Sequence, residues 1–120
     1  FFRKRILMKS ITEIDKKLTE LKETEEGIIN STEPVTNEIK VILVGSQLQQ
    51  AVIKHTMNME ESEVEAMLEK ETKKLKKINH DYAIASKNED MKNKRALHAA
   101  EWTCDIKVHT LNWLLGNTLD

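Results

Sequence analysis

The chain has 120 residues, of which 19 are basic and 20 acidic, and its net charge of −1 excludes a global field that would draw it to nucleic acid or to an anionic membrane. Three glycines and one proline supply too few turns for a sheet protein of this length. We therefore predict an all-α protein, either an antiparallel four-helix bundle or a set of coiled-coil-like helical hairpins, forming a single domain over residues 1–120.

The sequence opens with FFRKRIL, which has cations but neither a long apolar region nor a small-residue cleavage site, so it is not a secretory signal. We interpret residues 1–7 as a disordered or non-native extension, with Met8 as a candidate native start. No apolar run approaches the roughly 20 residues that cross a bilayer. We expect a cytoplasmic protein, or one of the host cytoplasm. The Lys, Glu, Ile and Asn usage fits an AT-rich microbial or viral genome.

The first expected helix ends between Gly27 and Asn30. Ser10 and Glu13 have capping-box spacing, so the helix begins at Ser10 or, alternatively, near Arg5. Its apolar residues recur with heptad spacing, at Leu7, Ile11, Ile14, Leu18, Leu21 and Ile28. A glutamate, Glu25, occupies the one slot where a further apolar residue belongs. This stripe is typical of a helix that packs along another helix.

The second expected helix covers residues 33–56, with Thr32 as its cap and Pro34 in its first turn. It is apolar on two sides, with one set formed by Ile39, Leu43, Ile53 and Met57 and the other by Val41, Val44, Leu48 and Val52. A helix of this kind has neighbours on both sides, so we expect it to be the most buried element. The run VILVG also fits a strand, but a helix is favoured because no turn signal follows.

The third expected helix has Asn58 as its cap, with Glu61 three residues on. Its stripe alternates spacings of four and three, at Val64, Leu68, Glu71, Leu75, Ile78, Tyr82 and Ala85. Glu71 interrupts this stripe as Glu25 interrupts the first one. Polar residues in such a seam can fix register and partner number. The alternative is that each glutamate lies near a helix end and reaches solvent.

A fourth helix is expected from Ser86, which has capping-box spacing to Glu89, to Leu115, with Gly116 as its stop. Alternatively, the third and fourth helices are continuous. The fourth helix has two apolar stripes about 160° apart, one of Leu97, Cys104, Val108, Leu111 and Leu115 and one of Trp102, Ile106 and Trp113. One stripe suffices for an internal seam, so the second must meet another helix of the chain or a partner. Because tryptophans are enriched at binding hot spots, the candidate partner-binding residues are Trp102, Ile106 and Trp113.

Between these stripes lies a polar strip that is the only weak candidate for a metal site, formed by His98, Glu101, Asp105 and His109. A metal in a helical bundle needs ligands converging from several helices, and the other histidines stand singly, so we interpret the strip as solvent-exposed. Cys104, the single cysteine, lies mid-helix on the leucine stripe, where a thiol acts as an apolar filler. No catalytic motif is present, and we expect neither an enzyme nor a cofactor.

Candidate basic patches are formed by Arg3, Lys4, Arg5, Lys73, Lys74, Lys76 and Lys77. These could contact phosphates, although acidic residues are interleaved with most of them. The function we predict is a non-enzymatic helical protein–protein interaction module, in an assembly, adaptor or inhibitor role. We expect it to self-associate through heptad seams and the tryptophan-bearing C-terminal helix, or to bind a helical partner. The alternative is a nucleic-acid-associated accessory protein, and membrane attachment is not favoured because one short cluster binds only marginally.

Overall fold

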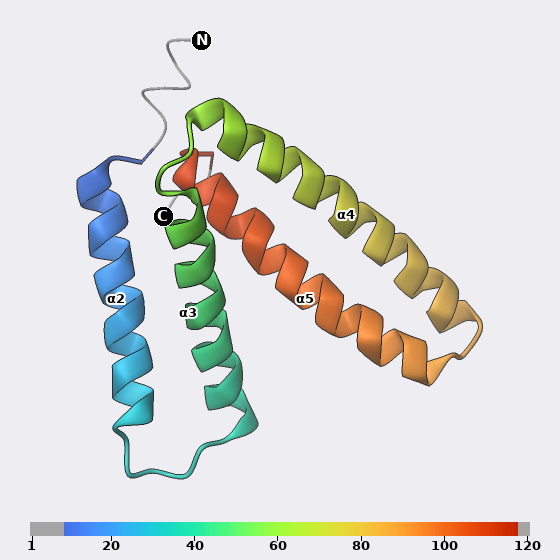
Figure 1. Ribbon diagram of the computed structural model, residues 1–120. Coiled ribbons are helices and arrows are strands. Elements are labelled where there is room, and N and C mark those ends of the chain that lie inside the picture. The colour runs from blue at the N-terminus through green and yellow to red at the C-terminus, as the bar shows by residue number, and fades with distance from the viewer. Residues whose placement is uncertain (1–8, 118–120) are drawn as a thin grey trace.

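The computed structural model describes residues 9–117, which form four helices: α2 (Ile11–Ile29), α3 (Asn37–Thr56), α4 (Glu61–Lys87) and α5 (Met91–Leu114) (Figure 1). No strand occurs within these residues, so the predicted all-α class is confirmed. The predicted extension at residues 1–7, the candidate start Met8 and the basic residues Arg3, Lys4 and Arg5 lie outside the described residues.

Three local predictions are confirmed: the capping box at Ser10, the helical state of the VILVG run, and the stop at Gly116. The hydroxyl of Ser10 accepts a hydrogen bond from the Glu13 N–H at 3.2 Å, and the Glu13 carboxylate accepts one from the Ser10 N–H at 3.3 Å. The helix α2 therefore begins directly after its N-cap, Ser10. The VILVG run lies inside α3, so the helical interpretation is correct. Gly116 follows the end of α5 with a φ of 74°, a conformation that glycine adopts without steric cost.

The predicted start of the second helix is wrong. Thr36, not Thr32, caps α3, and its hydroxyl accepts from the Ile39 N–H at 3.2 Å. In the preceding loop the hydroxyl of Ser31 accepts from the Glu33 N–H at 3.1 Å, and this local bond turns the chain away from helix. Thr36 offers the same capping chemistry as Thr32 but directly precedes the apolar run.

The predicted starts of the third and fourth helices are also wrong. The N-cap of α4 is Glu60 rather than Asn58, and the Glu63 carboxylate accepts from the Glu60 N–H at 3.2 Å. The N-cap of α5 is Asp90, whose carboxylate accepts from the Asn93 N–H at 3.2 Å. Ser86 lies inside α4. The third and fourth helices are thus separate, and Glu89 has a φ of 56° in the turn between them.

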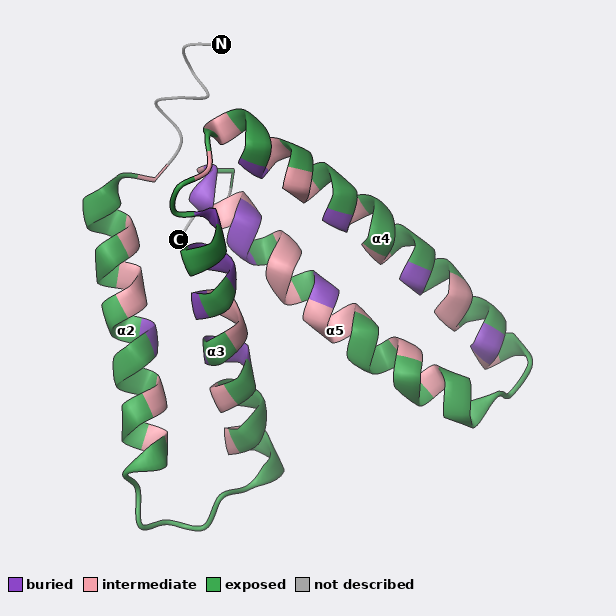
Figure 2. Ribbon diagram, in the orientation of Figure 1, coloured by how far each residue is buried: buried purple, intermediate pink, exposed green. Residues whose placement is uncertain are grey.

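The four helices form two antiparallel hairpins, α2 with α3 and α4 with α5, which meet through α3 and α5 (Figure 1). All four helices contribute to one core where the hairpins meet, formed by Leu21, Val52, Ile53, Val64, Leu111, Leu114 and Leu115 (Figure 2). From this core the hairpins diverge, so the molecule is flat, with extents of 48 × 44 × 22 Å. Its radius of gyration is 16.6 Å, against about 13.6 Å for a compact domain of this length. Of the two predicted architectures, the paired hairpins describe the molecule better than a closed bundle.

The prediction that the second helix would be the most buried is confirmed, since α3 has more buried residues than any other described helix, but its burial is uneven along its length. Its buried residues all lie in the C-terminal part, namely Gly45, Ser46, Gln50, Val52, Ile53 and Thr56. In the N-terminal half, Val41, Ile42 and Val44 are each about half exposed. The reason is the divergence of the hairpins, which separates α3 from α5 on the N-terminal side of Gly45, so that α5 does not cover these side chains.

Both seam glutamates contact other helices. The alternative that each reaches solvent near a helix end is wrong for Glu71, which is buried, whereas Glu25 lies near the end of α2 and keeps part of its surface exposed. The Glu25 carboxylate accepts hydrogen bonds from the side-chain amides of Gln50 at 2.8 Å and Gln47 at 3.3 Å, both on α3. These two bonds lower the pKa of Glu25, the bond from Gln50 having the larger effect. Glu71 is buried in α4, and its carboxylate lies 3.7 Å from the Lys107 ammonium of α5.

The seam glutamates should respond in opposite directions to replacement by leucine. Glu71→Leu removes a buried charge while Lys107, with a 30% exposed side chain, keeps access to water, so we expect stabilisation of about 1 kcal/mol. Glu25→Leu leaves the buried Gln50 amide without its acceptor and should lower the urea midpoint. Urea denaturation of both variants measures this contrast. Shifts of the same sign would contradict these roles.

Candidate functional site: an apolar wedge groove between the hairpins

The exposed apolar side chains of the described residues gather around the first half of α3. Nine large hydrophobic residues are exposed, and five of them lie between residues 29 and 44, namely Ile29, Val35, Val41, Ile42 and Val44. Single exposed hydrophobics are ordinary on a protein surface, but a local concentration marks a surface that another molecule covers.

Two of these residues help to form a groove between the diverging hairpins. The groove has a volume of about 510 Å³ and is lined by Lys40, Val41 and Val44 of α3 and by His98, Ala99 and Trp102 of α5. We call it the wedge groove. Its lining residues come from α3 and α5, two helices that separate towards the N-terminus of α3 (Figure 1).

The narrow end of the wedge groove is closed at Gly45. A Cβ atom placed on Gly45 would lie 3.8 Å from Cζ2 of Trp102 and 3.8 Å from Cδ1 of Ile106. Both α5 side chains therefore pack directly on the α3 backbone at this point. Beyond it, towards the N-terminus of α3, the helices diverge and the valines are uncovered.

The three predicted partner-binding residues do not share one exposed ridge. Trp102 and Ile106 lie against α3 at Gly45, and both are only partly exposed. Trp113 packs against the core, and its ring lies 5.2 Å from the Lys9 ammonium and 5.8 Å from that of Lys17. The second apolar stripe of α5 thus meets α3 and the start of α2. Of the three residues, Trp102 alone lines the wedge groove.

The leucine stripe of α5 faces α4, and Cys104 lies within it. The Cys104 thiol is buried and donates a hydrogen bond to the carbonyl oxygen of Glu71 at 3.3 Å. Burial, and to a lesser degree the charge of Glu71, raises the pKa of Cys104. Since the thiolate is the nucleophilic form, this environment disfavours reactivity at Cys104.

The polar strip of α5 offers no assembled ligand set. His98, Asp105 and His109 are exposed and Glu101 is partly exposed. Within residues 9–117 no three His, Cys, Asp or Glu side chains converge on a position that could hold a metal ion. His98 instead lies beside Tyr82, with ring centroids 6.4 Å apart, and contributes to one wall of the wedge groove.

The basic patch of α4 is exposed but carries mixed charge. Its lysines, at Lys73, Lys74, Lys76 and Lys77, all face solvent. The Glu69 carboxylate lies 3.1 Å from the Lys73 ammonium, which reduces the positive potential there. None of these lysines lines the wedge groove.

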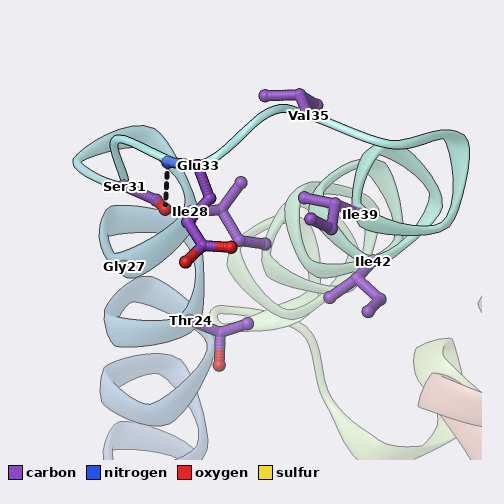
Figure 3. Close-up of a pocket in the computed structure, with 8 residues that line it drawn as sticks. All are labelled: Thr24, Gly27, Ile28, Ser31, Glu33, Val35, Ile39 and Ile42. Carbon is purple, nitrogen blue, oxygen red and sulfur yellow. Dashed lines mark hydrogen bonds between the residues drawn. The ribbon is translucent and has the colours of Figure 1, made fainter.

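A second hollow lies on the other side of the same half of α3, at the tip of the first hairpin. It has a volume of about 300 Å³, and Ile28 from α2 and Ile39 and Ile42 from α3 lie around it (Figure 3). Val35 is on the loop that spans this end. The first half of α3 is therefore bordered by an apolar hollow on each side.

Comparison of the chain with protein-family models, with curated proteins and with solved structures finds no match. In the described part of the chain, no helix combines the length and the apolar character needed to span a membrane.

Sequence reasoning found Trp102 but missed most of the wedge groove. Val41 and Val44 were assigned to a buried face, and Ala99 and Lys40 were not singled out. The available signal was the two-sided apolar pattern of residues 39–45, which indicates more apolar surface than one neighbouring helix can cover.

Substitutions at Gly45 test the contact that closes the groove. Gly45→Ala adds a methyl group at ordinary van der Waals distance, so the gain in helix propensity should stabilise the fold by about 0.5–1 kcal/mol. Gly45→Leu should force apart Trp102 and Ile106 and destabilise by about 1–3 kcal/mol. Thermal denaturation measures both effects.

Gly27 provides the matched control, because it also lies in a helix and a Cβ there meets nothing within 4 Å. Both Gly27→Ala and Gly27→Leu should be tolerated. If Gly45→Leu is tolerated as well as Gly27→Leu, the two hairpins do not meet at Gly45.

Proposed function

We propose that the chain is a non-enzymatic protein-interaction module that binds an amphipathic helix in the wedge groove. The main support for this proposal is the groove itself. Val41 and Val44 of α3, each about half exposed, line one wall, and Ala99 and Trp102 of α5 line the other. Such a site fits helix-in-groove recognition, in which the apolar face of one helix lies between two others.

The dimensions and chemistry of the walls favour a helix as the ligand. Val41 and Val44 are three residues apart, so they form one ridge on α3, and the small Ala99 leaves room on the opposite wall for close approach. Helices pack with axes 8–10 Å apart, which a pair of diverging helices accommodates along part of its length. Covering each half-exposed valine contributes about 1 kcal/mol to binding.

The nucleic-acid alternative has less support. The exposed lysines of α4 are interleaved with carboxylates such as Glu69, whereas the groove walls carry only Lys40 and His98 as titratable groups. An apolar groove of this kind offers little to a phosphate backbone, whose binding depends on several cations acting together.

Display of a library of amphipathic helical peptides tests the proposed function. Selection on the immobilised chain should enrich peptides with apolar residues at i, i+3 and i+4 spacing. These peptides should lose binding to a Val44→Glu variant and retain it on an Ile84→Glu variant, because Ile84 is equally exposed but does not line the groove.

Two outcomes would contradict the proposal. One is failure to enrich helical peptides at all. The other is enrichment of peptides that ignore Val44→Glu. Salt-sensitive retention of DNA or RNA by the same immobilised chain would favour the nucleic-acid alternative.

A further inference from the structure

The chain exposes more surface than a compact monomer of its mass. Its accessible surface is 8788 Å², whereas a compact protein of 13.9 kDa exposes about 6,700 Å². Even if the eleven residues outside 9–117 were counted as wholly exposed, at about 2,060 Å², the described part would keep an excess of about 570 Å². A stable protein–protein interface of standard size removes about 800 Å² from each partner. The excess is therefore close to the roughly 600 Å² that each copy loses in the smallest stable interfaces.

The exposed apolar surface is also suited to pair with itself. A two-fold interface brings the same patch of two copies together, so the patch must offer both a groove and a projection. The first half of α3 offers both, because Val41 and Val44 form one wall of the wedge groove and project from α3 with about half of their surface uncovered.

We propose that the occupant of the wedge groove is α3 of a second copy, so that two chains form a two-fold symmetric dimer. The two α3 helices cross antiparallel near residue 42, and Val41 of each chain lies against Val44 of the other. Both valines then approach Ala99 and Trp102 on the opposite wall. This inference rests on the function proposed above and names its partner.

The charges of the chain permit this association. A net charge of −1 produces little repulsion between two copies. No carboxylate lines the wedge groove, so none is desolvated beside its symmetry mate. Lys40 can extend its ammonium to solvent while its aliphatic stem covers apolar surface.

Sedimentation of the full chain from low to high micromolar concentration tests the dimer. We expect the wild-type chain to approach twice its monomer mass of 13.9 kDa as concentration rises. Val44→Glu places an unpaired charge in the contact and should weaken dimerisation about 100-fold, with helix content by circular dichroism unchanged. Ile84→Glu is the matched control, since it replaces a side chain of similar exposure at the tip of the other hairpin and should leave the dimer intact.

A second measurement locates the contact without relying on a destabilising change. In a Cys104→Ala background, Val41→Cys combined with Val44→Cys should give a covalent dimer on mild oxidation, because each introduced thiol faces the other in the second copy. Ile84→Cys in the same background should stay monomeric on a reducing-agent-free gel.

The outcomes separate this inference from the function on which it rests. A wild-type chain that stays monomeric overturns the dimer, and if it still binds helical peptides in a Val44-dependent manner, the wedge groove serves a different helical partner. A dimer that survives Val44→Glu and gives no Val41–Val44 cross-link also overturns the proposal, because its interface lies elsewhere.

Discussion

Leu111 has no exposed surface, and it belongs to the one cluster to which all four helices contribute. This cluster holds the two hairpins together at one end only. Beyond this cluster and the adjoining contact of Trp102 and Ile106 with Gly45, each hairpin can bury apolar surface only between its own two helices. In the second hairpin that is sufficient, because Ile78 and Ala85 stay buried along α4. In the first hairpin it is not, because α3 is apolar on two sides and α2 covers one of them. The wedge groove follows from this unequal division of apolar surface.

Polar contacts between the two helices of each hairpin favour one register of their packing. Glu25 joins α2 to α3 through Gln47 and Gln50, and Glu71 joins α4 to α5 through Lys107. Within residues 9–117 no buried side-chain nitrogen or oxygen lacks a hydrogen-bond partner. Because a shifted register would separate these pairs and leave their groups unsatisfied, each contact favours one alignment of its hairpin. The register within each hairpin matters for the proposed site, because one wall of the wedge groove belongs to α3 of the first hairpin and the other to α5 of the second.

The two tryptophans of α5 belong to one apolar stripe in the sequence but lie in different environments in the structure. Trp113 packs against the core, and Lys9 and Lys17 lie over its ring, so it stabilises the chain itself. Trp102 packs on Gly45 with part of its ring and lines the wedge groove as well. The sequence places both tryptophans on one stripe, and that stripe was a reasonable candidate for partner contact. Only Trp102 reaches the groove, because Trp113 packs against the core at the end where the two hairpins meet.

The sequence by itself determined those features that depend on neighbours three or four residues apart. These are the helical stripes, the capping box at Ser10 and the stop at Gly116, and all are present in the structure. The sequence did not determine which of several possible N-cap residues begins a helix. For α5, both Ser86 and Asp90 could serve, and the N-cap is Asp90 because of where the hairpin turns. Only the tertiary structure decided the divergence of the hairpins and the exposure of Val41 and Val44. Both depend on where α3 and α5 meet, which is set by contacts such as those of the shared core and of Gly45 with Trp102, and no local periodicity encodes contacts between residues so far apart in the chain.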